Sequence, residues 1–278
     1  MLDNPENKFK KLIRVVSISC AFLGIFVLFG WIFNIPLLKS IFPDTVTMKF
    51  NTALCITSLS LALYFINSGI SIQNKYLSKI LAAFVLLIGT LTLIEGIFQV
   101  NLGIDELIVK DFDTRFPKNL VPGRMSQTSA FCFILLGTSF LLLKSKKKTI
   151  QIICNILLNV TTLITFIAAL GYLYNVPTFY KLAFLTSMAV HTSIALCTLS
   201  IAASLINYKI GLVGIYTGYK IGNKMARILS LQIVTMIIIL TYLRLLTHRF
   251  DYVSVEFGII LFSLSFIITS IFIINSSC

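Results

Sequence analysis

Three hydrophobic runs open on one short phrase, which reads Met48-Lys49-Phe50-Asn51-Thr52-Ala53, then Met125-Ser126-Gln127-Thr128-Ser129-Ala130, then Met188-Ala189-Val190-His191-Thr192-Ser193. Each copy, here called a Met phrase, has a methionine, two variable positions, a polar side chain, a hydroxyl and a small residue. An internal repeat of this kind indicates a repeated supersecondary unit. We therefore expect three similar helix pairs, with a Met phrase at the start of the second helix in each pair.

The composition of the chain is that of a membrane protein. Of its 278 residues, 57% are hydrophobic and only 12% are charged, and the mean hydropathy is +0.95. Soluble domains carry about 25% charged residues. Apolar runs of about 20 residues are long enough to cross a bilayer, and inside a bilayer the backbone must satisfy its own hydrogen bonds, which favours helices. The predicted class is an all-α polytopic membrane bundle.

The apolar runs divide into eight expected transmembrane helices, at 12–33, 48–66, 80–100, 125–143, 150–174, 188–206, 226–246 and 255–274. The first six form the three repeated pairs within 1–207. A final pair, which lacks the Met phrase, follows an inner loop within 208–278. The longest outer segment, 101–124, is expected to form a cap over the outer face, helical in part around 105–109. A loop of that length is often functional.

The distribution of the basic residues, which give the chain a net charge of +13, predicts its orientation in the membrane. If the N-terminus is cytoplasmic, fourteen of the 23 basic residues lie on the inner side: Lys8, Lys10, Lys11, Arg14, Lys75, Lys79, Lys144, Lys146, Lys147, Lys148, Lys209, Lys220, Lys224 and Arg227. This is the positive-inside bias. It predicts that both termini are cytoplasmic and that the basic residues meet anionic lipid. The lipid bilayer is therefore an expected partner, and nucleic acid is not.

The polar positions of the Met phrases are the first candidate binding site. In a helix they fall in the opening turn, where they either cap free backbone N–H groups or line a shared pocket. If the three pairs surround a common centre, three helix N-termini converge near the outer leaflet and favour an anion or a carbonyl group. Both interpretations stay open for Asn51, Thr52, Thr128, Ser129, His191 and Thr192.

Glu95 is the ionisable residue that lies well inside a predicted span. An intramembrane carboxylate is a functional candidate by default. The alternative is that Glu95 reaches the interface or pairs with Arg124, which precedes the fourth helix. We therefore include Glu95 and Arg124 among the candidate ligand-binding residues.

The first helix of each pair also has a recurring ending, in which a glycine precedes aromatic or bulky residues: Gly30-Trp31-Ile32-Phe33, Gly96-Ile97-Phe98 and Gly171-Tyr172-Leu173-Tyr174. Small residues allow close helix packing in membranes, and aromatic residues gather at the membrane interface. We interpret these endings as a packing contact followed by an aromatic belt.

No motif for catalysis, metal or cofactor binding is present. The six cysteines lack metal-ligand spacing, and His191 and His248 are not placed as a haem-binding pair. Nucleotide loops and hydrolase motifs are absent from the sequence. We expect no enzyme activity, catalytic residue, metal or cofactor in this chain.

The chain resembles the multi-pass N-terminal sensor region of bacterial sensor histidine kinases, including hybrid and PAS-containing kinases. The resemblance runs in order through most of the chain: Gly30 to Phe33, Ile35 to Ser40, Pro43 to Leu54, Leu102 to Leu107, Pro122 to Ser126, Met188 to Thr192, Leu243 to Leu246 and Glu256 to Gly258. The second Met phrase departs from it, with Gln127-Thr128-Ser129 where the family tends to have Pro-Asn-Thr.

This resemblance implies a sensor in the bacterial inner membrane that relays a signal through its last helices. It further implies a homodimer and a cytoplasmic kinase transmitter, in the same chain or as a partner. The printed sequence stops after the last span, so we expect kinase activity to need a transmitter that it lacks. The expected stimulus is either a small-molecule ligand or a change in the state of the membrane. A small-solute transporter or a non-catalytic scaffold is the alternative function.

Overall fold

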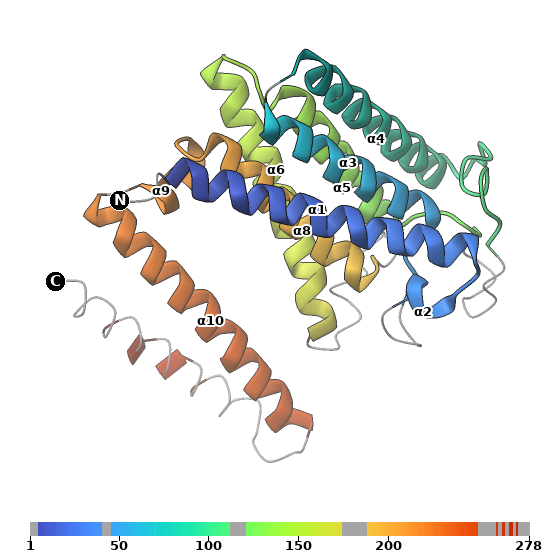
Figure 1. The fold of residues 1–278 in the computed structure, drawn as a ribbon. Coiled ribbons are helices and arrows are strands. Elements are labelled where there is room, and N and C mark those ends of the chain that lie inside the picture. Colours follow the sequence, from blue (N-terminus) through green and yellow to red (C-terminus); the bar gives the residue numbers. More distant parts are fainter. Residues whose placement is uncertain are drawn as a thin grey trace. The chain divides into compact units, whose positions relative to one another are not determined.

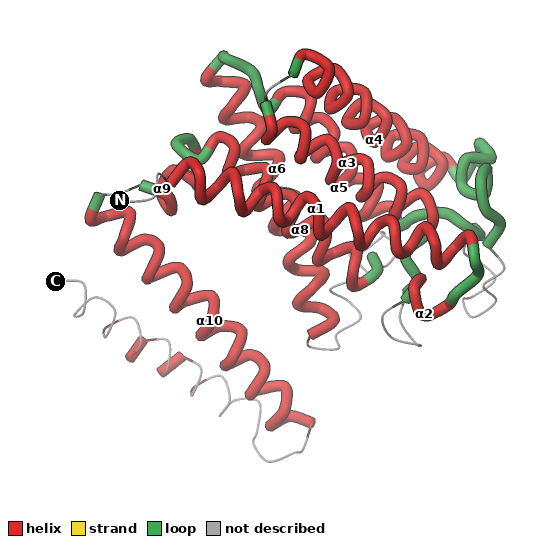
Figure 2. Tube along the Cα trace, viewed as in Figure 1, coloured by secondary structure: helices red, strands yellow, loops and turns green. Residues whose placement is uncertain are grey.

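The computed structural model describes residues 5–40, 46–69, 71–111, 121–173, 188–218 and 220–249, with short helical pieces between 260 and 271. Helices and connecting turns make up these residues, and no strand occurs among them (Figure 2). The all-α class is therefore confirmed. The helices are α1 (Pro5–Ile32), α2 (Pro36–Lys39), α3 (Phe50–Ser68), α4 (Ile72–Phe98), α5 (Gln127–Leu142), α6 (Lys148–Leu173), α8 (Val190–Ser204), the 3-10 turn η1 (Leu205–Asn207), α9 (Gly211–Thr217) and α10 (Ile221–Arg249).

The chain divides into two compact units, Met1–Ile210 and Gly211–Cys278. In the first unit, the most extensive helix contacts join α1 to α3, α4 to α5 and α6 to α8. These are the three expected pairs (Figure 1). Neighbouring pairs meet where α3 contacts α4 and α5 contacts α6, and α1 closes the ring by contacting α8.

The three helices that begin with a Met phrase form the centre of this ring. α3, α5 and α8 contact one another as well as their pair partners. In α3, 72% of the most apolar 18-residue window is buried, against 33% in each of α1, α4 and α6. The arrangement around a common centre, on which the pocket hypothesis depended, is therefore present.

The outer helices of the ring turn an apolar face outward. On α1 this face includes Val15, Ile18, Phe22, Phe26 and Phe29, which recur every three or four residues and are 41–57% exposed. That spacing is one face of a helix, and large exposed apolar side chains are stable where the surroundings are lipid rather than water. The composition of this surface is therefore that of a helix face in contact with a bilayer.

Glycines allow two of the pairs to approach closely. A Cβ added to Gly24 of α1 lies 3.0 Å from the carbonyl oxygen of Ala53, and one added to Gly89 of α4 lies 2.9 Å from that of Ala130. Ala53 and Ala130 are the small residues of the first two Met phrases, and both are fully buried. The small position of the phrase is thus where one helix crosses its partner at short distance.

Six helices are long and apolar enough to cross a membrane: α1, α3, α4, α6, the run Val190–Asn207 and the Ile221–Ile238 part of α10. The eight expected spans are not confirmed. α5 has 16 residues and a length of about 24 Å, which is short of the bilayer core of about 30 Å. Most of the expected span at 255–274 lies outside the described residues, as do residues 112–120 of the cap loop.

The second unit contains a short helix joined to a long one. The side chain of Asn223 donates to the carbonyl oxygens of Gly214 and Ile215, and Arg227 Nη1 donates to those of Tyr216 and Gly218. Because the last carbonyls of a helix lack partners within it, a cation there is favourable. The start of α10 therefore holds the end of α9.

Candidate functional site

The three Met phrases have one backbone geometry. The second residue of each phrase is the N-cap, with extended φ and ψ angles, and the helix begins at the third. In each copy the amide of the sixth residue donates to the carbonyl of the second, over 3.1, 2.9 and 3.0 Å in chain order. The repeat seen in the sequence is therefore a repeat of structure at the start of each central helix.

All six candidate residues of the phrases are buried, with 1–7% of each exposed: Asn51, Thr52, Thr128, Ser129, His191 and Thr192. Among the three N-cap positions, a side-chain cap hydrogen bond is made by Ser126, whose Oγ accepts from the amide of Ser129, while Lys49 and Ala189 make none. The capping interpretation of the six candidate residues stays a prediction.

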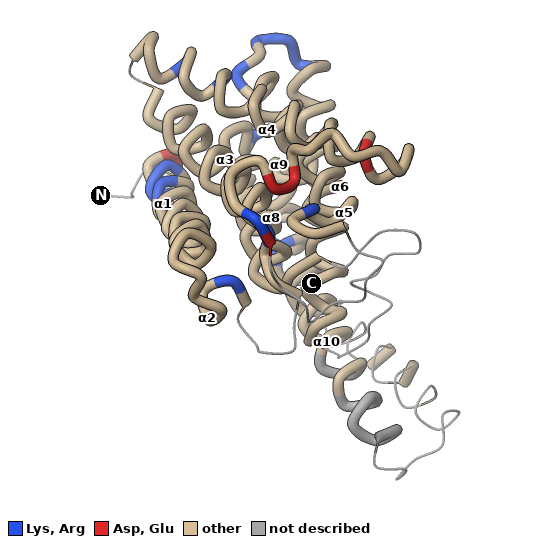
Figure 3. Tube along the Cα trace, turned by 90° about the vertical axis from the view of Figure 1, so that its right-hand side faces the viewer, with Lys and Arg blue, Asp and Glu red and all other residues tan. Residues whose placement is uncertain are grey.

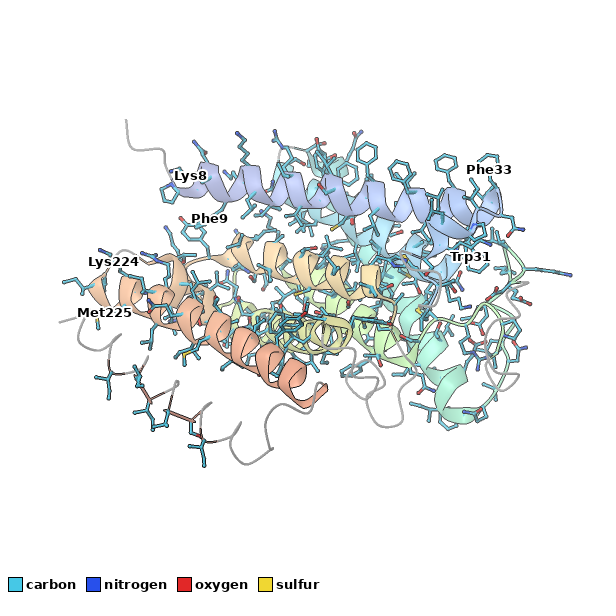
Figure 4. All side chains as sticks on the ribbon, turned by 90° about the horizontal axis from the view of Figure 1, so that it is seen from below. Lys8, Phe9, Trp31, Phe33, Lys224 and Met225 are labelled. Carbon is cyan, nitrogen blue, oxygen red and sulfur yellow. The ribbon has the colours of Figure 1, made fainter. Side chains whose placement is uncertain are left out.

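Two aromatic residues bind the methionines of the phrases. Trp31 Nε1 donates to the carbonyl oxygen of Met48 over 2.8 Å, and the Tyr172 hydroxyl donates to that of Met188 over 2.5 Å. Trp31 is 4% exposed and lies on the side of α1 that faces the other helices, whereas Phe33 points away from them (Figure 4). Trp31 and Tyr172 therefore join the end of one helix to the start of its partner, and their place in an aromatic belt stays a prediction.

The second pair uses a different contact. Its equivalent of Trp31 is Ile97, which has no polar hydrogen to donate and is 64% exposed. The side chain of Gln127, in the second Met phrase, lies against Gly96 instead, so close that a Cβ on that glycine would clash with Gln127 Nε2. Gln127 belongs to the part of the phrase that departs from the family pattern, and its contact is specific to this pair.

Replacing Trp31 with phenylalanine is expected to lower the free energy of unfolding by about 1–3 kcal/mol, because the buried Met48 carbonyl loses its donor. The measurement is thermal unfolding of the purified protein in detergent, followed by circular dichroism. Replacing Phe33 with leucine is the matched control, since Phe33 is 65% exposed and its substitution leaves that bond in place. Equal unfolding temperatures for the two variants would contradict the fastening role.

The cap segment 101–111 is held to the starts of α3 and α5. Asn51 Nδ2 donates to the carbonyl oxygen of Ile104 over 2.9 Å. Lys49 Nζ lies 2.6 Å from Asp111 Oδ2, which also accepts from the Gly123 amide over 3.1 Å. Figure 3 looks at this side of the bundle and shows acidic and basic positions next to one another. The expected helix at 105–109 is wrong: these residues form turns and bends, held by tertiary contacts.

Arg124 is the centre of a buried charged cluster. Its Nε donates to Asp105 Oδ2 over 2.7 Å, and its Nη2 lies 3.7 Å from Glu95 Oε1. Arg124 also donates to the carbonyl oxygens of Glu95 and Val100, and the Leu102 amide donates to Glu95 Oε1 over 2.7 Å. The structure therefore brings Glu95 and Arg124 together, as the second of the two sequence interpretations predicted, and adds Asp105.

The two carboxylates of this cluster face a single guanidinium. Glu95 is fully buried and Asp105 is 5% exposed. Burial raises the pKa of Asp105 to about 6, partly offset by its hydrogen bond with Arg124, and the neighbouring charge of Glu95 raises it further. A proton is consequently held at this position up to mildly acidic pH.

Several buried polar atoms at this end of the bundle have no hydrogen-bond partner among the described residues: Thr47 Oγ1, Thr92 Oγ1, Glu95 Oε2, Asp105 Oδ1, His191 Nε2 and Thr192 Oγ1. Each belongs to a residue that is at most 5% exposed. A buried polar group without a partner costs about 1–3 kcal/mol. They lie at the Met phrases, at the end of α4 and in the cap.

Among the described residues, no group of three or more histidine, cysteine or acidic side chains is placed to hold a metal ion. The polar groups are instead hydroxyls, an imidazole and a carboxyl pair, which suit hydrogen bonding. Such groups can donate hydrogen bonds to a polar ligand or accept them from it.

Asp105, Lys49, Asp111, Trp31 and Tyr172 are the residues that sequence reasoning missed. The glycine-aromatic endings were a usable signal for Trp31 and Tyr172, because both carry a polar hydrogen. The sequence contained no such signal for the charged cap residues, because loop residues follow no periodic pattern. Comparisons with protein-family models, curated proteins and solved structures found no match.

Proposed function

We propose that this chain is a membrane-embedded sensory module of the histidine-kinase type. In this proposal it perceives a small molecule or the state of the membrane near the outer leaflet, and it relays the change through its last helices. The membrane is the bacterial inner membrane, and both termini are cytoplasmic. The single observation that carries the proposal is the set of unpartnered buried polar atoms at the cap, at the end of α4 and at the starts of α3 and α8.

The arrangement of that end of the bundle supports sensing. α3, α5 and α8 contact one another, so a ligand that rearranges the start of one central helix acts on the other two. The cap contains no helix among its described residues 101–111, and ion pairs attach it to Lys49 and Arg124. A ligand shifts such an equilibrium only by binding its two states with different affinity, and a cap that is attached or released provides two such states.

The histidine-kinase part of the proposal is supported by the sequence resemblance. Transport receives less support, because substrate sites of transporters are typically formed at breaks in helices near the bilayer midplane. The described helices α3, α4 and α6 each continue unbroken over 19, 27 and 26 residues. The unpartnered groups of Thr92 and Glu95 lie in the last two turns of α4, near the cap.

The relay is tested without knowing the ligand, by loosening the cap. The substitution Asp111→Asn removes the charge that pairs with Lys49 and keeps an oxygen for the Gly123 amide. We expect hydrogen–deuterium exchange of amides 101–111 to rise by about fivefold, which corresponds to about 1 kcal/mol of local opening. If the module relays this change, exchange across 211–218 and the first turns of α10 also changes in lipid nanodiscs.

The matched control for this experiment is Glu106→Gln. Glu106 is exposed in the same loop, and its Oε1 accepts from the Asp111 amide, a role that a glutamine oxygen retains. We expect no change at α9 or α10 in this variant. A cap that loosens in Asp111→Asn while exchange in the second unit stays the same would contradict the sensory proposal.

A further inference from the structure

The pair Glu95 and Asp105 has more hydrogen-bond acceptors than its surroundings satisfy. Glu95 Oε1 accepts from the Leu102 amide, and Asp105 Oδ2 accepts from Arg124 Nε. The other oxygen of each group, Glu95 Oε2 and Asp105 Oδ1, is buried and has no partner. Each carboxyl is therefore half satisfied.

The two carboxyl groups share one guanidinium, with Glu95 Oε1 3.7 Å from Arg124 Nη2 and Asp105 Oδ2 2.7 Å from Arg124 Nε. As two carboxylates they cannot bond, because a carboxylate only accepts. A single proton removes this difficulty, since it converts one oxygen into a donor and leaves the other as its acceptor. Two acidic groups that share a site and one proton are the known solution to like charges at short distance.

The charges around the pair agree with one bound proton. The titratable or charged groups of the cap and of the starts of the central helices are Arg124 before α5, Lys49 at the start of α3, Glu106, Lys110 and Asp111 in the cap, and His191 at the start of α8. Lys49 is paired with Asp111, which leaves Arg124 as the cation in contact with the pair. With one proton, the pair and Arg124 are electrically balanced. Without it, they carry one uncompensated buried negative charge.

We infer that Glu95 and Asp105 form a proton-binding site that holds one shared proton while the cap is attached and loses it as the pH on the cap side rises. Release of the proton leaves two negative charges on one guanidinium and weakens the attachment of residues 101–105 to α4. The pKa of Asp105, raised to about 6 by burial, supports this site. Because the folded state favours the protonated form, the cap is held most tightly below the ordinary pKa of an aspartate and less tightly above about pH 6.

The proton site deepens the proposed sensory function by naming protons as a stimulus, and it rests on that function only for its consequence in the second unit. Proton binding and cap release are measured on the cap itself. If the proton site titrates as expected but exchange in α10 does not change, the proposed sensory function is contradicted and the proton site is not. If the proton site does not titrate, this inference is contradicted, and the sensory proposal stands with another stimulus.

The first test is infrared difference spectroscopy of the full chain in lipid nanodiscs between about pH 4.5 and about pH 8. We expect the carbonyl stretch of a protonated carboxylic acid to disappear with a midpoint near pH 6, where the Asp105 carboxyl titrates. This measurement needs no variant, so it remains decisive if substitutions impair folding. The absence of such a band would overturn the inference.

The second test uses Trp31 emission as a reporter of the cap. Trp31 is the single tryptophan of the chain, and Lys49 Nζ lies 5.9 Å from its ring while bonded to Asp111. We expect its emission to change with the same midpoint as the infrared band. Asp105→Asn is expected to abolish the transition, and Glu95→Gln to move it down by about one pH unit or more, because the like charge is removed.

Two control variants and one ion substitution separate the alternatives. Glu106→Gln, in the same loop, and His191→Asn, in the third Met phrase, are expected to keep the wild-type midpoint. A transition that survives Asp105→Asn, or that is lost in His191→Asn, would overturn the inference. So would a midpoint that moves when sodium is replaced by a bulky organic cation, because a metal ion rather than a proton would then fill the site.

Discussion

Replacing Arg124 with alanine is expected to destabilise the protein by about 3–5 kcal/mol near neutral pH, the cost of removing one partner from a buried ion pair. Arg124 is the cation in contact with both Glu95 and Asp105, and it also holds the carbonyl oxygen of Val100. Its loss leaves two buried carboxyl groups without a counter-charge. The measurement is thermal unfolding in detergent, followed by circular dichroism.

The pH dependence of this variant has a definite sign. Protonated carboxyl groups need no counter-charge, so the loss of stability in Arg124→Ala is expected to shrink at about pH 5 and to grow at about pH 8. Arg124→Lys keeps the positive charge but lacks the planar guanidinium that reaches Asp105 and Val100 together. Its unfolding temperature is expected to lie between those of the wild type and Arg124→Ala. Lys110→Ala, an exposed lysine of the same cap, is the control. Equal unfolding temperatures for Arg124→Ala and Lys110→Ala would contradict the central place of Arg124.

Replacing Gly89 with valine is expected to destabilise the α4–α5 pair by about 1–3 kcal/mol or more, as overpacking of a close interface does. The new Cβ would lie 2.9 Å from the carbonyl oxygen of Ala130, 3.2 Å from Phe133 Cβ and 3.3 Å from Ile134 Cγ1. Backbone and Cβ atoms of α5 cannot move aside as the end of a long side chain can. The unfolding temperature of the purified variant measures the effect.

The control for Gly89→Val is the same change at Gly222, where an added Cβ meets nothing within 4 Å. Gly222 lies in the first turn of α10, where a side chain has open space, so this variant shows the effect of a valine that meets no neighbour. Gly24→Val should behave like Gly89→Val, because its Cβ would lie 3.0 Å from the Ala53 carbonyl. The two losses should add, since they fall on different helix pairs. A Gly89→Val protein as stable as Gly222→Val would contradict the close crossing at the small position of the phrase.

The helix pairs and the starts of the central helices were predictable from sequence. α3, α5 and α8 begin at Phe50, Gln127 and Val190, the third residue of each phrase, within two residues of the expected positions. Local chemistry explains this success, because a polar segment followed by a long apolar run defines where a helix begins in a membrane. The expected span at 125–143 is longer than α5, because apolar content alone does not show that this helix has only 16 residues.

The candidate site was predictable in part. Asn51, Thr128 and His191 were expected at the start of the central helices and are buried there. Their partners were not predictable, because a hydrogen bond such as that from Asn51 to Ile104 joins residues 53 positions apart. The difference between Trp31 and Phe33, two residues apart, depends on which side of α1 faces the other helices.

By itself, the sequence determined that the chain forms apolar helices, that they come in repeated pairs, and that each central helix opens on the same phrase. These properties follow from local hydrophobicity and from repetition, which act along the chain. The tertiary structure alone decided that Asp105 joins Glu95 on Arg124, and that Trp31 and Tyr172 hold the carbonyls of Met48 and Met188. Such contacts join residues far apart in the chain, and their strength comes from burial, which exists only once the helices have packed.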